Sequence, residues 1–218
     1  MASLPYVVPF AVVIALLGLH PVVPLSPVAE QAVWILVMTA TLALVARPAL
    51  DFRIRNWFGS LALGVLVFLI WIGPDWIFPG YHGFWLFTNP VTGSMAATIP
   101  ESSRGDALLM TLRTARSALF VPIAEELFWR AWLMRWIISP RFAEVPLGAW
   151  SARAFWIVAV LFAAEHGPLW DVGLAAGVLY NWWMVRTKSL GDLILAHAVT
   201  NACVSGYVLL AGRWEYWP

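Results

Sequence analysis

Six side chains that can take part in acid–base chemistry interrupt apolar stretches in the second half of the chain. They are two carboxylates, a guanidinium, two imidazoles and a carboxamide: Glu125, Glu126, Arg130, His166, His197 and Asn201. A carboxyl group shielded from water can act as a general base or acid. Imidazole and carboxamide N–H groups can stabilise a developing oxyanion. Brought together, these groups would be sufficient for hydrolysis.

The adjacent glutamates need a particular explanation, because an ionised side chain at the centre of a membrane helix costs roughly 2.5–3.5 kcal/mol. Glu126 and Arg130 are four residues apart, share a helix face and can form a structural ion pair, which leaves Glu125 unexplained. Pro122, three residues before Glu125, should kink the helix and free a backbone carbonyl. Such a feature is tolerated inside a packed bundle or beside a polar cavity.

The other polar positions are weak signals when each is taken alone. His166 ends an apolar stretch and by itself suits a residue at the membrane interface, as does its neighbour Glu165. His197 and Asn201 share a helix face, and that pair alone is explained by a hydrogen bond between helices. If the three helices adjoin, however, their polar groups form one pocket within the membrane.

The composition indicates which kind of fold must position these residues. Of 218 residues, 61% are hydrophobic and 11% are charged, and mean hydropathy is +0.78; soluble domains carry roughly 25% charged residues. These values exclude a soluble enzyme and a disordered regulator, and a net charge of +1 offers no basic face for nucleic acid. The single cysteine, Cys203, excludes a disulfide framework. The sequence therefore predicts an all-α, polytopic transmembrane helix bundle with a polar intramembrane cavity.

At about 20 residues per span, the chain has room for seven to eight spans. Seven stretches are suitable, within one integral membrane domain over residues 1–218 whose motif-bearing core is 118–205. The longest remaining piece, 74–117, is punctuated by Gly and Pro and is expected to form loops, followed by an amphipathic helix on the membrane surface over 104–117. The expected spans are 5–23, 30–46, 56–73, 118–138, 152–166, 169–185 and 190–211.

Basic residues in the loops predict an orientation, since Lys and Arg are enriched in cytoplasmic loops. With a cytoplasmic N-terminus, the outside loops hold only Arg104 and Arg213. The inside loops then hold the larger group, which consists of Arg47, Arg53, Arg55, Arg135, Arg141, Arg153, Arg186 and Lys188.

Three short motifs resemble those of the CPBP family of intramembrane proteases, relatives of the type II CAAX prenyl endopeptidases. Glu125–Arg130 has the form E-E-x-x-x-R, Phe162–His166 the form F-x-x-x-H, and His197–Asn201 the form H-x-x-x-N. Arg186–Leu190 also resembles that family's R-T-x-S-L turn, and the resemblance extends over roughly 118–205. The run around the glutamates further resembles the bacterial branch associated with exosortase protein-sorting systems, which implies a bacterial inner membrane.

The resemblance implies a role for each residue. Glu125 would activate the attacking water and His166 would help to hold it, while His197 and Asn201 would form the oxyanion hole. Glu126 and Arg130 would support the site. A peptide bond of a membrane-associated protein or peptide would be cut by water without an acyl-enzyme, because the motifs contain no Ser or Cys. The identity and prenylation of the substrate and the oligomeric state stay open.

Two alternatives stand beside this interpretation. Glu125, His166 and His197 are acceptable ligands for zinc or a related ion, although the absence of a His-Glu-x-x-His motif favours a glutamic-type mechanism without cofactors. The chain could also be a non-catalytic membrane protein on the same scaffold, either a small transporter or an immunity or interaction partner. Intramembrane Glu and His residues also build proton relays.

Overall fold

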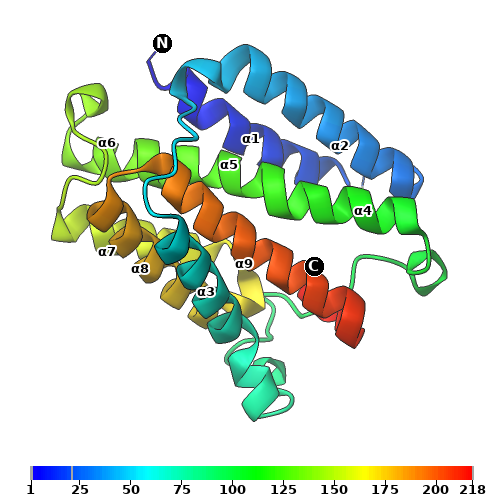
Figure 1. Ribbon diagram of the computed structural model, residues 1–218. Coiled ribbons are helices and arrows are strands. Elements are labelled where there is room, and N and C mark those ends of the chain that lie inside the picture. Colours follow the sequence, from blue (N-terminus) through cyan, green and yellow to red (C-terminus); the bar gives the residue numbers. More distant parts are fainter. Residues whose placement is uncertain (1, 21, 218) are drawn as a thin grey trace.

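The computed structural model describes residues 2–20 and 22–217, which form a helical bundle without any β-strand in these ranges (Figure 1). This confirms the predicted all-α class. The α-helices in this part of the chain are α1 Leu4–Leu19, α2 Pro27–Thr41, α3 Trp57–Ile77, α4 Ala107–Ala115, α5 Val121–Glu126, α6 Met134–Ile138, α7 Ala152–Ala164, α8 Trp170–Thr187 and α9 Leu190–Ala211.

Within the described ranges, four helical segments are long and apolar enough to cross a membrane: Pro27–Ala49, Trp57–Ile77, Ala107–Ile138 and Leu190–Ala211. The expected count of seven to eight spans is therefore not confirmed. Helices α1 and α7 are apolar but shorter. Residues 78–104, part of the piece expected to form loops, contain short 3₁₀ turns and one isolated β-bridge, and no further span.

The helix expected over 104–117 is present from Ala107, but it is not a separate segment, because it continues directly into the next span. Helices α4, α5 and α6 are joined by two π-helical segments, η5 (Arg116–Phe120) and η6 (Leu127–Leu133), into one helix of 32 residues. The Asp106 side chain caps its start by accepting a hydrogen bond from Leu109 N at 3.0 Å, and neither Gly nor Pro follows before Pro122. One basic residue of the expected surface helix, Arg116, is therefore buried in the bundle.

The long helix α4–α6 crosses the middle of the bundle, with α1 and α2 on one side and α9 on the other (Figure 1). Small residues let its neighbours approach closely. A Cβ at Gly64 of α3 would lie 2.5 Å from the carbonyl oxygen of Ala196 in α9, and one at Gly177 of α8 would lie 3.1 Å from that of Ala159 in α7. The contact at Gly64 is shorter than a side chain allows and the one at Gly177 is tight, so small residues permit the close packing of α3 on α9 and of α8 on α7.

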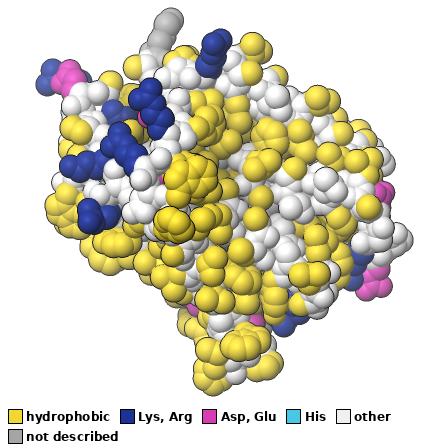
Figure 2. Space-filling model, in the orientation of Figure 1, with side chains coloured by type: hydrophobic (Ala, Val, Ile, Leu, Met, Phe, Trp, Pro, Cys, Tyr) yellow, Lys and Arg dark blue, Asp and Glu magenta, His cyan; other side chains and the backbone are white. Residues whose placement is uncertain are grey.

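The surface has the character expected beside lipid. Figure 2 shows hydrophobic side chains over most of the visible face, with Lys and Arg gathered near the end where the chain enters α3 and α9. Large aliphatic side chains such as Leu36, Leu44 and Leu210 are 68%, 82% and 92% exposed. Burying them in a bilayer would remove this apolar area from water.

Outside the candidate spans, a buried histidine that the sequence analysis did not single out fastens the segment after α3. The ring of His82 is hydrogen-bonded through Nδ1 to Asp75 and through Nε2 to Asp171, the latter at 3.0 Å. Tyr216 donates its hydroxyl to the Asp75 carboxylate at 3.2 Å, so the C-terminal segment joins the same cluster.

The His82 cluster predicts that stability depends on pH. Burial alone lowers the pKa of His82, but hydrogen bonds and attraction from Asp171 and Asp75 outweigh it and raise the pKa above 6.5. The stabilisation is therefore complete below pH 6.5 and lost as pH rises through the folded-state pKa. Thermal unfolding in detergent between pH 5 and 9 should show this decline in wild type and not in His82→Gln. Parallel pH profiles for the two proteins would contradict the assignment.

Candidate active site

The two adjacent glutamates face different surroundings, because consecutive residues of a helix point about 100° apart. Glu125 lines a cavity of about 240 Å³, whereas Glu126 turns into the bundle and is fully buried. The π-helical segments η5 and η6 lie immediately before and after α5, which ends with these residues. Interruptions of this type occur frequently at functional sites.

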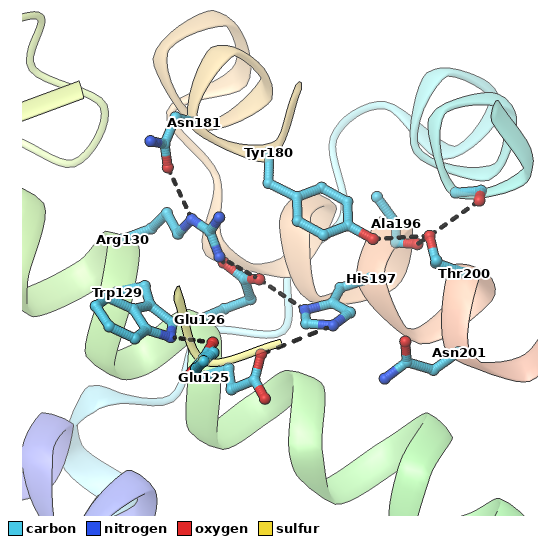
Figure 3. A network of polar contacts seen from close by, with 12 residues as sticks. Glu125, Glu126, Trp129, Arg130, Tyr180, Asn181, Ala196, His197, Thr200 and Asn201 are labelled. Atoms are coloured by element: carbon cyan, nitrogen blue, oxygen red, sulfur yellow. Dashed lines mark hydrogen bonds and ion pairs between the residues drawn. The ribbon is translucent and has the colours of Figure 1, made fainter. Parts of the chain in front are cut away.

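Glu126 belongs to a chain of buried polar contacts shown in Figure 3. Arg130 Nη1 donates to both carboxylate oxygens of Glu126, at 2.9 and 3.1 Å. Arg130 Nε donates to Asn181 Oδ1 of α8 at 2.8 Å, and Asn181 Nδ2 donates to the carbonyl oxygen of Phe155 at 2.8 Å. The predicted ion pair is therefore present and joins the long helix to α7 and α8.

His197 of α9 lies between the two glutamates (Figure 3). Its Nδ1 is 2.7 Å from Glu126 Oε1, and its Nε2 is 3.9 Å from Glu125 Oε2. The ring stacks on Tyr180 with a centroid separation of 4.9 Å. An ionised carboxylate only accepts hydrogen bonds, so Nδ1 must hold a proton and Nε2 faces Glu125.

Tyr180 is itself held in place, so its ring can fix the plane of the His197 imidazole. Its hydroxyl donates to Thr200 Oγ1 at 2.7 Å, and that oxygen lies 2.9 Å from the carbonyl oxygen of Gly64. Helices α3, α8 and α9 therefore share one polar contact beside the imidazole. A locked ring is what a catalytic imidazole requires.

Glu125 has spare hydrogen-bonding capacity at the wall of the cavity. Its Oε2 atom is buried, and no described residue lies within hydrogen-bond distance of it. The nearest cationic or potentially cationic group is His197 Nε2, at 3.9 Å. When two polar atoms are this far apart, a water molecule can bridge them.

His166 reaches the same cavity from the turn between α7 and α8. Its Nδ1 is 2.6 Å from the carbonyl oxygen of Phe162, so Nδ1 donates a proton and Nε2 remains the accepting atom. The ring rests against Trp71 with a centroid separation of 5.1 Å. A Cβ at Gly173 would lie 3.2 Å from the His166 side chain, so this glycine makes room for it.

Asn201 is anchored by a defect in the long helix. Pro122 lacks an N–H, and Val121 N donates to the carbonyl oxygen of Arg116, so the carbonyl of Ser117 loses both possible helical donors. Asn201 Nδ2 donates to Ser117 O at 2.9 Å instead. The expectation that Pro122 frees a carbonyl is confirmed, and the replacement donor comes from α9.

The structure brings the predicted residues together as the sequence analysis required. Glu125, His166, His197 and Asn201 all line the one cavity. Glu126 and Arg130 lie behind it and reach it through His197. The condition that the three motif-bearing helices adjoin is met, while the catalytic role of each residue stays a prediction.

Other residues of the site had no motif to identify them. Asn181, a lone amide in an apolar stretch, was the available signal for the Arg130 contact, and Tyr180 resembled any core aromatic residue. Glu165 is exposed and accepts a hydrogen bond from Trp129 Nε1 at 3.0 Å, in keeping with its expected place beside the site. The cavity is also lined by Trp71, Arg113, Arg116, Ser117, Thr200, Tyr216 and Trp217.

The possible metal ligands do not form a cluster in the described residues. Across residues 2–20 and 22–217, no group of three or more His, Cys, Asp or Glu side chains is placed to hold a metal ion. His197 is near both Glu125 and Glu126, but Glu126 is already engaged by Arg130. The proposed ligand trio Glu125, His166 and His197 is thus not assembled as a metal centre.

Comparison with known proteins shows a similarity to one protein family over part of the chain. No curated protein and no solved structure matches the chain. A family model described as Type II CAAX prenyl endopeptidase Rce1-like matches residues 107–203, the segment that contains all six predicted site residues. Over this segment, which is a little less than half of the chain, the protein is similar to the Rce1-like type II CAAX prenyl endopeptidases.

Proposed function

We propose that the protein is an intramembrane endopeptidase that hydrolyses a peptide bond of a membrane-associated protein or peptide. The observation that supports it most strongly is the pairing of Glu125 with His197 across 3.9 Å at the wall of a cavity, with the Glu126–Arg130 pair behind. The similarity of residues 107–203 to an endopeptidase family supports the class of reaction. The site then has to supply a base, a nucleophile and an oxyanion donor.

Water is the proposed nucleophile. A water molecule within hydrogen-bond distance of Glu125 Oε2 would lie beside His197 and in the cavity that His166 also lines. Glu125 removes a proton as the water attacks the carbonyl carbon of the scissile bond, and then returns it to the leaving amine. The accepting Nε2 atom of His166 would hold a hydrogen of the same water.

The developing negative charge on the carbonyl oxygen needs donors. His197 can supply Nε2–H when its imidazole holds two protons, because Glu126 balances the additional charge through Nδ1. Asn201 can supply its second amide hydrogen, since only one is used by Ser117. These are the two residues that the family resemblance assigns to the oxyanion hole.

Charge balance explains why Glu126 and Arg130 accompany the catalytic pair. With Glu125 and Glu126 ionised, and with Arg130 and His197 positive, the four groups sum to zero. A cluster without net charge is the least costly arrangement in an apolar interior. We therefore assign Glu126 and Arg130 the role of positioning His197 and balancing its charge.

The proposed mechanism uses no metal ion. Glu125 and His197 face one another directly, and Glu126 is occupied by Arg130. We further propose a location in a bacterial inner membrane with a cytoplasmic N-terminus, consistent with the basic loops. A prenylated protein and a bacterial sorting-signal precursor are both admissible substrates.

Cleavage should require His197 and should resist chelation. Membrane proteomics of cells that produce wild type or His197→Ala should reveal an uncleaved precursor in the variant only. Arg141→Ala, a change at an exposed position outside the cavity, should behave as wild type. A peptide from that precursor should be cut by purified enzyme in vesicles equally well with and without 1,10-phenanthroline. Full processing by a folded His197→Ala protein would contradict the protease. Inhibition that added zinc reverses would instead establish a metal-dependent reaction.

A further inference from the structure

Two arginines that the proposed mechanism does not use line the active-site cavity. Arg113 and Arg116 lie on α4 and η5, on the helix that also holds Glu125. Arginine within a membrane span is rare, and it marks a functional site or a buried pair. Among the described residues that line this cavity, Glu125 is the one acidic group, so positive side chains outnumber negative ones.

Arg116 makes its contacts with neutral groups. Its side chain is buried, and Nη1 donates to Gln31 Oε1 at 3.2 Å. The guanidinium lies 4.7 Å from the centre of the Trp34 ring. These contacts orient the guanidinium, and no carboxylate among residues 2–20 and 22–217 forms an ion pair with it.

Arg113 stands one helical turn before Arg116 and faces the same space. Its Nη2 donates to Thr98 Oγ1 at 3.5 Å, and its guanidinium lies 5.8 Å from the centre of the Trp217 ring. Both arginines also line a second cavity of about 350 Å³. There the acidic residue is Glu30, whose carboxylate is hydrogen-bonded to His20 at 2.8 Å.

We propose that Arg113 and Arg116 form a carboxylate-binding subsite that selects substrates with an anionic group a few residues from the scissile bond. The inference rests on the proposed function. Arg116 precedes Glu125 by nine residues, about 13 Å along a helix axis, so the bound carboxylate lies away from the attacking water. Repulsion from Glu125 and attraction to the guanidiniums favour the same placement. The guanidinium fork matches a carboxylate in geometry as well as in charge.

Three peptides distinguish the source of the carboxylate. Each is S-farnesylated, presented in phosphatidylcholine vesicles and identical apart from its end: a free C-terminal carboxylate, a C-terminal carboxamide, or a carboxamide with aspartate as the last residue. Wild type should have a KM about tenfold or more lower for the free carboxylate than for the plain carboxamide. If the KM of the aspartate peptide equals that of the free-carboxylate peptide, a side-chain carboxylate also binds the subsite. If its KM equals that of the plain carboxamide peptide, the subsite binds only the C-terminal carboxylate of the chain.

Variants assign the preference to the arginines. Arg116→Gln should raise KM for the carboxylate peptide at least tenfold with kcat nearly unchanged, and should leave the carboxamide peptide unaffected. Arg116→Lys, which keeps the charge without the fork, should retain part of the preference. Arg104→Gln, a change outside both cavities, should retain all of it. The subsite would be refuted if wild type cleaved all three peptides with the same KM. It would also be refuted if Arg116→Gln raised KM equally for all three peptides.

Binding separates failure of the subsite from failure of the proposed function. Tryptophan fluorescence can follow binding, since Trp34 and Trp217 contact the two guanidiniums. Glu125→Gln protein should bind the carboxylate peptide at least tenfold more tightly than the carboxamide, and adding Arg116→Gln should remove that difference. Preferential binding without any cleavage by wild type would retain the subsite and refute the protease. Cleavage of the carboxylate and carboxamide peptides without any difference in binding would refute the subsite and retain the protease.

Discussion

Glu125→Gln is expected to lower kcat by about 100- to 10,000-fold, the range for removing a general base. The amide has nearly the shape of the carboxylate but cannot take a proton from water. KM should change little, because Glu125 acts on the attacking water and the proposed substrate contacts lie elsewhere. The measurement is initial-rate kinetics of the purified variant in vesicles, with a substrate peptide identified by proteomics.

Glu165→Gln provides the matched control for this experiment. Glu165 is also a glutamate near the site, but it is exposed and does not line the cavity. Its substitution removes an acceptor for Trp129 and should leave kcat within about threefold of wild type. If Glu125→Gln retained full activity in a folded protein, or if both variants lost activity equally, Glu125 would not be the base.

The convergence of the polar motif residues could be predicted from the sequence because intramembrane polar residues are few. A charged side chain in an apolar stretch needs a partner, so Glu126 and Arg130 could be paired from their spacing alone. The three motif-bearing helices were expected to adjoin, because a polar group that faced lipid on any one of them would be unfavourable. The structure brings all three motifs to one place.

Other features depended on contacts between distant parts of the chain. Asn201 binds the carbonyl of Ser117, 84 residues earlier, which the H-x-x-x-N motif cannot reveal. The 104–117 segment has an amphipathic pattern like that of a surface helix, yet it is continuous with a span. There, Arg113 and Arg116 face a cavity rather than water. Periodicity shows which residues share a face, but not which neighbour covers it.

Arg130→Met is expected to lower the free energy of unfolding by about 3–5 kcal/mol, because removing one partner leaves the Glu126 charge buried without compensation. Methionine replaces much of the volume but neither the charge nor the donor to Asn181. Reversible unfolding in mixed detergent micelles measures the loss. A change below about 1 kcal/mol would show that the ion pair contributes little to stability.

The double variant Glu126→Gln/Arg130→Met separates stability from catalysis. It removes both charges together, so most of the lost stability should return, as for other buried pairs replaced by neutral groups. Activity should not return, since His197 then lacks the carboxylate that balances a doubly protonated ring. We expect kcat to stay at least about tenfold below wild type. Recovery of stability and activity together would mean that the Glu126–Arg130 pair only holds the helices together, and that His197 functions without that pair.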